Sequence, residues 1–247
     1  MAEETLQSEA NGRGKRRRPS RPRSGRGFGA ETATTLLLAS AILGLSVPRC
    51  VAAFHGIPGN NSLQALYGQE AASDESVNYL ISSRQLASAW LPAGSTLLEM
   101  SVGYVEAARR AGAGTPAGKA YLAEARKVLI KGLASAPADG FGWARLAYVR
   151  QALGEAPEDV LRDLQLSFET TRFDRRMMMF RLDMAFALRH LWGPEMTDLM
   201  VSQVRMAWVF DVSGVAFMSV RRGGVPFMRA TLPPGPGGLD LFENIIR

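Results

Sequence analysis

The longest apolar feature of the chain is residues 32–48, a stretch of seventeen positions without a charged side chain. Its leucine and isoleucine residues surround the whole circumference of a helix, so the segment lacks the polar face of a surface helix. Seventeen residues are at the short end for crossing a ~30 Å hydrocarbon layer, and residues 51–54 extend the apolar surface past Arg49. The pattern predicts a transmembrane helix or a signal sequence at residues 32–54.

Three interpretations of this segment stay open. The favoured one is a membrane anchor, the next is a signal sequence that is cleaved after Ala53, and the least favoured is a helix in a soluble core. The small residues Val51, Ala52 and Ala53 stand where a signal peptidase requires them, behind an apolar core. In the first two cases the residues beyond 55 end up outside the cytoplasm.

After the apolar segment the pattern changes twice. Residues 55–74 are rich in glycine, asparagine and serine, and they are expected to form a linker. From residue 75 to 211, apolar residues recur every three to four positions, which is the period of helices. We expect helices that begin near residues 74, 95, 117, 140, 157, 174 and 195, with Ser95 capping the second and Pro157 opening the fifth. The sixth helix is expected to run to Trp192, and the fold class is all-α.

The last part of the chain, residues 212–247, reads as a Pro/Gly-rich C-terminal tail. Its only regular feature is a weak strand candidate at 212–220, and an unbroken run of proline and glycine follows at 233–238. The final segment, 239–247, is amphipathic, and we expect it to dock on the domain; the alternative is that it serves as a peptide ligand.

The expected helix starts recur at steps of roughly 34 to 40 residues, close to the spacing of tetratricopeptide repeats. Two neighbouring segments also carry the small and large residues of that repeat at the family's spacing. The residues of this motif are Ala125, Leu129, Gly132 and Pro137 in one helix and Trp143, Leu146 and Ala147 in the next. In these features residues 95–210 resemble a tetratricopeptide (TPR) protein.

The resemblance implies antiparallel helical hairpins stacked as a solenoid, with a concave groove that binds proteins. Small residues at Ala125, Gly132 and Ala147 would let adjacent helices approach closely, while Trp143 and Leu146 fill the space between them. The alternative is an unrelated helical bundle.

The net charge of +6 is located mainly in residues 1–31, which carry eight basic and four acidic side chains. This leader has no apolar periodicity and is expected to be disordered. Basic residues before an apolar span hold that side in the cytoplasm and attract anionic lipid headgroups. Nucleic-acid binding is the less favoured interpretation, because no aromatic residues alternate with the charges.

The sequence gives little support for catalysis. It contains one cysteine, Cys50, and two histidines, His55 and His190, which are far apart in the chain. They form neither a metal-ligand cluster nor a nucleophile–base pair at a recognisable spacing. We therefore expect a non-catalytic protein without a cofactor.

One surface is a candidate for binding a partner. Several arginines gather in the segment 172–189, and they would suit an acidic polymer or peptide; the alternative is a solvated helix face with local ion pairs. The candidates are Arg172, Arg175, Arg176, Arg181 and Arg189.

Together these features predict a bacterial single-pass protein of the inner membrane, with a cytoplasmic basic tail and a periplasmic TPR-like domain. It would act as a scaffold or assembly factor for protein partners of a cell-envelope system, such as polysaccharide export or secretion. The first alternative is a cleaved, soluble periplasmic helical-repeat protein, and the second is a nucleic-acid-binding protein that uses the basic leader.

Overall fold

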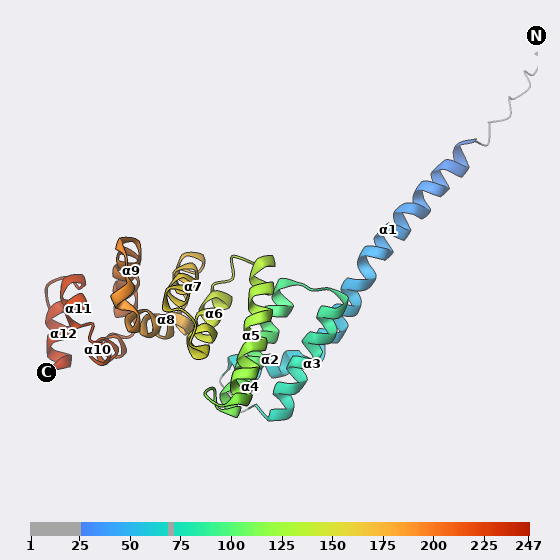
Figure 1. Cartoon of the computed structure of the whole chain (residues 1–247). Helices are drawn as coiled ribbons and strands as arrows, with labels where there is room; N and C mark the ends of the chain where they lie inside the picture. The colour runs from blue at the N-terminus through green and yellow to red at the C-terminus, as the bar shows by residue number, and fades with distance from the viewer. Residues whose placement is uncertain (1–25, 69–71) are drawn as a thin grey trace, which may run out of the picture. The chain divides into compact units, whose positions relative to one another are not determined.

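The computed structural model describes residues 26–68 and 72–247. The chain divides into two compact units, and the boundary in the sequence falls between Leu45 and Ser46. The described residues form helices and contain no β-strand, so the all-α prediction is confirmed for them (Figure 1). The expected disordered leader lies outside the described residues up to position 25. Its last residues, 26–31, are helical instead, because no proline follows Pro22 to prevent the apolar helix from extending backwards.

Helix α1 (Arg26–Gly56) contains the predicted apolar segment. It is long and apolar enough to cross a membrane, and the mean hydropathy of its most apolar 18-residue window is 1.9. Its large side chains are mostly exposed; Leu37, for example, is 72% exposed and Leu45 is 65% exposed. A helix in a soluble core would bury these side chains.

The expected linker, residues 55–74, is largely helical, which corrects the prediction from its composition. The chain continues from α1 into the 3-10 helix η1 (Ile57–Gly59) and helix α2 (Asn60–Tyr67). The buried Arg84 explains this order, because its guanidinium donates hydrogen bonds to the Gly56 carbonyl and to Asn60 Oδ1. Leu63 of α2 is also buried, so tertiary contacts override the weak helix propensity of glycine and asparagine.

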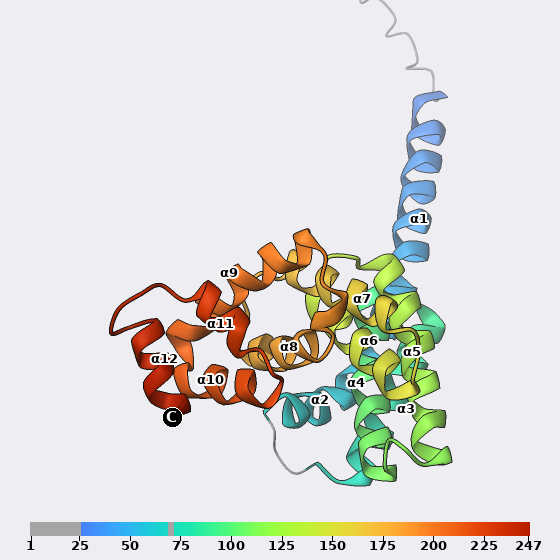
Figure 2. The same ribbon diagram turned by 60° about the vertical axis from the view of Figure 1, so that its left-hand side comes forward.

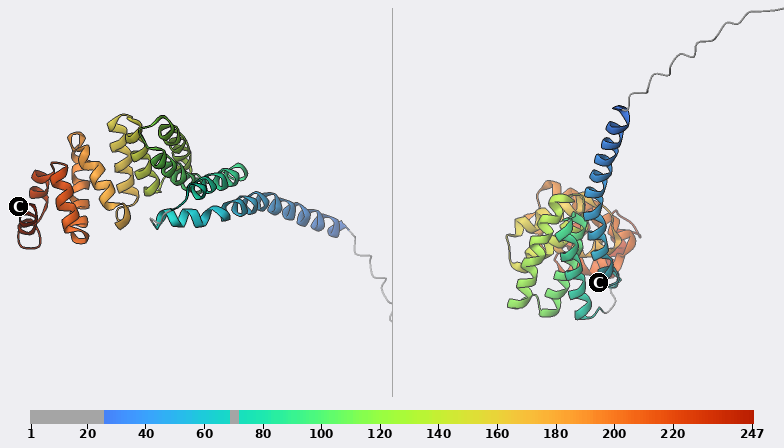
Figure 3. Two further views of the ribbon diagram at one scale, coloured as in Figure 1. Left: turned by 90° about the horizontal axis from the view of Figure 1, so that it is seen from below. Right: turned by 90° about the vertical axis from the view of Figure 1, so that its right-hand side faces the viewer.

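The next helices pack in chain order, each against its successor. They are α3 (Asp74–Trp90), α4 (Gly94–Ala111), α5 (Pro116–Ser135), α6 (Gly140–Leu153) and α7 (Pro157–Thr170). The right-hand view of Figure 3 shows α3, α4 and α5 side by side, and their short connections make neighbours antiparallel. Their positions agree with the predicted starts to within a residue or two.

Local signals in the sequence explain most of these boundaries. Thr115 and Asp139 act as N-caps, since their side chains accept hydrogen bonds from the backbone N–H groups of Gly118 and Gly142. Gly154 ends α6 in the left-handed conformation, with φ of 75°. The prediction for Ser95 is wrong: α4 begins at Gly94, so Ser95 lies inside the first turn and does not cap it.

Helices α8 (Arg175–Ala187) and α9 (Pro194–Phe210) follow, separated by the 3-10 helix η2 (Arg189–Leu191). The α-helix therefore ends before Trp192, where the sequence predicted its end. The indole N–H of Trp192 donates to the carbonyl of Ala185 at 3.1 Å, so the chain turns back on α8.

The expected C-terminal tail is structured, which corrects both the tail and the strand candidate. Residues 212–247 form helices α10 (Val212–Arg221), α11 (Val225–Thr231) and α12 (Leu239–Ile246), which gather around α9 (Figure 2). Asp211 caps α10, because its side chain accepts a hydrogen bond from the Gly214 N–H. Val215 and Ala216 of α10 are buried. The predicted docking of the final segment is confirmed, because Phe242 of α12 is fully buried.

Candidate functional site

The residues of the repeat-like motif come together where α4, α5 and α6 pack. Ala125, Leu129, Gly132, Leu146 and Ala147 are buried there. A Cβ atom added at Gly132 would lie 3.0 Å from the Leu98 side chain and 3.2 Å from the Gly94 carbonyl, so a larger residue would push α4 and α5 apart by a few tenths of an ångström or displace Leu98.

The other two motif residues lie at the surface of the same junction. Trp143 is partly buried and Pro137 is exposed, and the Trp143 indole N–H donates to the Pro137 carbonyl at 2.8 Å. The motif therefore locates a structural junction, and Pro137, Trp143 and Leu146 also line a hollow of about 440 Å³ beside it.

The five candidate arginines do not form one patch. Arg172 lines a cavity of about 550 Å³ between α7 and α9 together with the acidic residues Glu169, Glu195 and Asp198. Arg189 is on η2, and its guanidinium donates to the carbonyl of Arg222. The single basic surface that the sequence predicted is therefore divided among different faces.

Arg181 is fully buried and is not a surface residue, which corrects its assignment as a partner-binding candidate. Its Nη1 donates to the carbonyls of Ser167 and Thr171 at 3.0 and 2.7 Å, and its guanidinium lies 4.6 Å from the centre of the Phe168 ring. Burial lowers the pKa of Arg181 to about 10. The residue binds the carbonyl end of α7, where a cation is favoured by the helix dipole.

The first turn of α8 retains two exposed candidates, Arg175 and Arg176. The Arg176 guanidinium lies 5.2 Å from the centre of the Phe141 ring, and its Nη2 lies 3.4 Å from Asp174 Oδ2. Phe141 lines a groove in the surface, so Arg176 lies beside that groove.

The groove is the most apolar hollow that adjoins a candidate residue. It has a volume of about 320 Å³ and is formed by three helices, α4, α6 and α8, that are not consecutive in the chain. Its lining residues are Val105, Arg109, Phe141, Ala144, Arg145, Tyr148, Met177 and Phe180. The rings of Tyr148 and Phe180 lie 6.1 Å apart, so α6 and α8 supply adjacent aromatic side chains.

Arg145 is the charged group in the wall of this groove. It is half-buried, and its Nη1 donates to the Leu98 carbonyl at 3.0 Å and to Ser101 Oγ at 2.9 Å. Burial lowers the pKa of Arg145, and a hydrogen bond with the Tyr67 side chain opposes this shift. Among the described residues, no carboxylate forms an ion pair with Arg145, unlike the neighbouring Arg109, which pairs with Glu106 at 2.7 Å.

The sequence analysis missed Arg145, although a signal was present. Phe141, Ala144, Arg145 and Tyr148 recur at helical spacing on α6, on a different face from the motif residues Trp143 and Leu146. A basic residue among apolar ones on a second face of the helix indicates a surface outside the junction of the motif residues.

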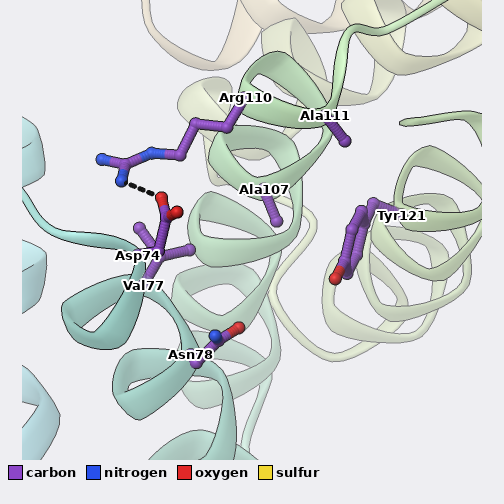
Figure 4. A pocket seen from close by; sticks show the side chains of 7 residues that line it. All are labelled: Asp74, Val77, Asn78, Ala107, Arg110, Ala111 and Tyr121. Atoms are coloured by element: carbon purple, nitrogen blue, oxygen red, sulfur yellow. Dashed lines mark hydrogen bonds and ion pairs between the residues drawn. The ribbon is translucent and has the colours of Figure 1, made fainter. Parts of the chain in front are cut away.

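A second hollow, of about 260 Å³, lies between α3, α4 and α5 (Figure 4). Arg110 crosses it and binds Asp74 Oδ1 at 2.5 Å, Glu106 Oε1 at 2.7 Å and the Ala72 carbonyl at 2.6 Å. Because these bonds use the whole guanidinium, Arg110 holds the start of α3 against α4. This hollow is a product of packing, and we do not assign a ligand to it.

The described residues offer no metal centre. In residues 26–68 and 72–247, no group of three or more His, Cys, Asp or Glu side chains is arranged to hold an ion. No protein-family model, curated protein or solved structure matches this chain.

Proposed function

We propose that this protein is a membrane-anchored, non-catalytic scaffold whose groove between α4, α6 and α8 binds a segment of a protein partner. The segment would present apolar side chains to the groove and a carboxylate to Arg145. The setting we propose is a cell envelope, with α1 in the inner membrane, the basic leader on the cytoplasmic side and the helical domain on the other side.

The anchor is supported by the composition and exposure of α1. It is long and apolar enough to span a bilayer, and the most apolar window is only 6% buried. Exposing leucine side chains to water is unfavourable, whereas contact with lipid hydrocarbon is favourable. An α-helix also satisfies its own backbone hydrogen bonds inside the bilayer.

The proposed scaffold is a TPR-like stack of hairpins, with α4/α5 and α6/α7 as two of its units. The support is the chain-order packing from α3 to α7 and the close approach at Gly132. In such a stack, the first helix of each unit lines one common face. The groove fits this pattern, since α4, α6 and α8 are alternate helices.

The observation that carries the proposal is the Arg145 guanidinium, a half-buried charge without an ion-pair partner among the described residues. Neutral acceptors, the Leu98 carbonyl and Ser101 Oγ, hold the Arg145 guanidinium in place, but they do not balance its positive charge. An acidic side chain or a C-terminal carboxylate of a partner would supply an opposite charge, and the apolar walls would strengthen the interaction by excluding water.

The test is site-specific photocrosslinking in cells that express the full-length protein. A photoreactive phenylalanine replaces Phe180 in the groove or, as a control, Phe217, which is 62% exposed on α10. We expect a discrete protein adduct from position 180 and not from position 217.

Charge variants then test the role of Arg145. Arg145→Met should reduce the adduct at position 180 by at least about tenfold, because truncating one partner of a desolvated, hydrogen-bonded charge pair costs about 2 kcal/mol or more. Arg145→Lys should restore part of it, and circular dichroism should show the same helix content for all variants. Equal adducts from both positions, or an adduct that does not depend on residue 145, would contradict the proposal.

A further inference from the structure

Helix α3 has an apolar stripe that its own domain does not cover. Tyr79, Leu86 and Trp90 are 51%, 53% and 51% exposed, and steps of seven and four residues place them on one face of the helix. Single exposed apolar residues are ordinary, but a row that ends in a tryptophan marks a contact surface.

The end of α3 faces the last two turns of α1 across a cavity, and α3 itself packs on η1. Residues of both elements, Ala52 and Ala53 of α1 with Ala87 and Leu91, line a common cavity of about 310 Å³. The buried Arg84 of α3 joins them further, since it binds the carbonyl of Gly56, the last residue of α1. Trp90, which directly precedes Leu91, therefore lies close to the level of Ala52 and Ala53 along α1.

The length of the apolar segment sets that level relative to a bilayer. Glu31 is the last charge before the segment, and a ~30 Å hydrocarbon layer requires about twenty helical residues after it. The far boundary of the hydrocarbon then falls at residues 51–52, one turn beyond Pro48. Arg49 can reach the headgroups from this position through its flexible side chain.

The surface near this level suits the boundary between lipid and water. Residues 86–98 contain no charged side chain, and Phe54 of α1 and Ile57 of η1 are 71% and 62% exposed. Tryptophan is enriched at the headgroup level of membrane proteins, because its ring is apolar and its N–H is polar.

We propose that the face of α3 formed by Leu86 and Trp90 lies in the headgroup layer of the membrane that α1 crosses. The inference rests on the proposed anchoring by α1. The lipid surface is its occupant, and contact there would hold the base of the helical domain against the bilayer. The groove at Arg145 would then be presented at a fixed height above the membrane.

The test uses full-length protein reconstituted into vesicles of phosphatidylcholine with brominated acyl chains, which quench tryptophans at the membrane boundary. Trp90→Phe should remove at least about half of the quenching, because Trp90 is the tryptophan placed at the headgroup level. The matched control, Trp143→Phe, changes a partly exposed tryptophan on α6 and should leave the quenching unchanged.

An alkaline carbonate wash of the same vesicles separates the two proposals. Protein that stays in the vesicles while Trp90→Phe and Trp143→Phe quench equally would overturn the α3 contact and leave the anchor intact. Protein released into the supernatant would overturn both. Equal helix content by circular dichroism ensures that the variants compare folded protein.

Discussion

The helical domain contains two hydrophobic clusters that are built from different side chains. The first, from α3 to α6, consists mainly of leucine, valine and alanine, with Tyr104 as its only buried aromatic residue. The second, from α6 to α12, contains six buried methionines and the buried rings of Phe168, Phe186, Trp208 and Phe242. Helix α6 belongs to both, since Leu146 is in the first cluster and Ala147 in the second.

The difference shows two ways to fill the space between helices. In the first cluster, Gly132 lets α4 and α5 approach closely, and small side chains fill the space that remains. In the second, flexible methionines and large rings fill the space between the helices. The rings of Phe186, Trp192 and Phe227 meet edge to face at centroid distances of 5.2 to 5.6 Å.

The largest effect is expected from a ring in the second cluster. Phe242→Ala should lower the free energy of unfolding by about 3–5 kcal/mol, because the fully buried ring leaves a cavity next to Trp208. Urea unfolding of the full-length protein in detergent micelles, followed by tryptophan fluorescence, measures this change. Phe217→Ala is the control, and its exposed ring should contribute less than about 0.5 kcal/mol.

This prediction also tests whether residues 239–246 belong to the domain. If α12 were a detachable tail, Phe242→Ala would change the unfolding midpoint no more than Phe217→Ala does. A loss confined to Trp208 fluorescence, without a change in circular dichroism at the same urea concentration, would show that the second cluster unfolds separately.

A smaller effect is expected from a glycine in the first cluster. Gly132→Val should destabilise the protein by roughly 1–3 kcal/mol, because the new side chain would meet Leu98 and the Gly94 carbonyl where no space exists. The same urea titration measures it. Gly114→Ala is the matched control, since a Cβ atom there has no neighbour within 4 Å. Equal midpoints for the two variants would contradict close packing at this junction.

The same difference explains which parts of the fold the sequence predicts. Boundaries from α3 to α7 follow from signals next to the helix ends, such as Thr115, Pro157 and Gly154. The sequence analysis predicted a strand in place of helix α10, because its valines favour strands. The helix is stabilised by tertiary contacts that bury Val215 and Ala216. Helix α2 was missed for a similar reason, since Arg84 lies far from it in the sequence.

The candidate site was predicted less well than the fold. The sequence shows a run of arginines from 172 to 189, but it does not show which of them are exposed. Arg181 is buried and donates hydrogen bonds to the carbonyls of Ser167 and Thr171. The groove depends on α4, α6 and α8 being adjacent in space. The spacing of residues along one helix cannot show that, so Arg145 became a candidate only with the structure.

The last predicted effect is a difference between the two clusters in how their stability depends on pH. Burial raises the pKa of Asp163 in α7 to about 6, although Arg150 Nε lies 2.9 Å away. In α4, the hydrogen bond from Arg109 lowers the pKa of Glu106 to about 2. Asp163 therefore binds its proton more tightly in the folded state, and its contribution to stability is lost as pH rises through about 6. Glu106 contributes in the opposite direction, and its stabilisation is lost as pH falls from 4.5 towards 2.

Asp163→Asn should accordingly remove a gain in stability that the native protein shows between pH 6 and pH 4. One proton gives a slope of at most about 1.4 kcal/mol per pH unit, so urea midpoints at pH 4, 5, 6 and 7 are needed to resolve it. Arg150 keeps Asp159 at 3.2 Å in this variant, so its charge stays paired.

Glu106→Gln is the counterpart. It should alter the pH dependence of stability only below pH 4.5, because the Glu106 carboxyl titrates in that range in both the folded and the unfolded state. If Asp163→Asn kept the native slope between pH 6 and pH 4, the carboxylate would be solvated, and the second cluster would be more open around α7 than the buried Asp163 indicates.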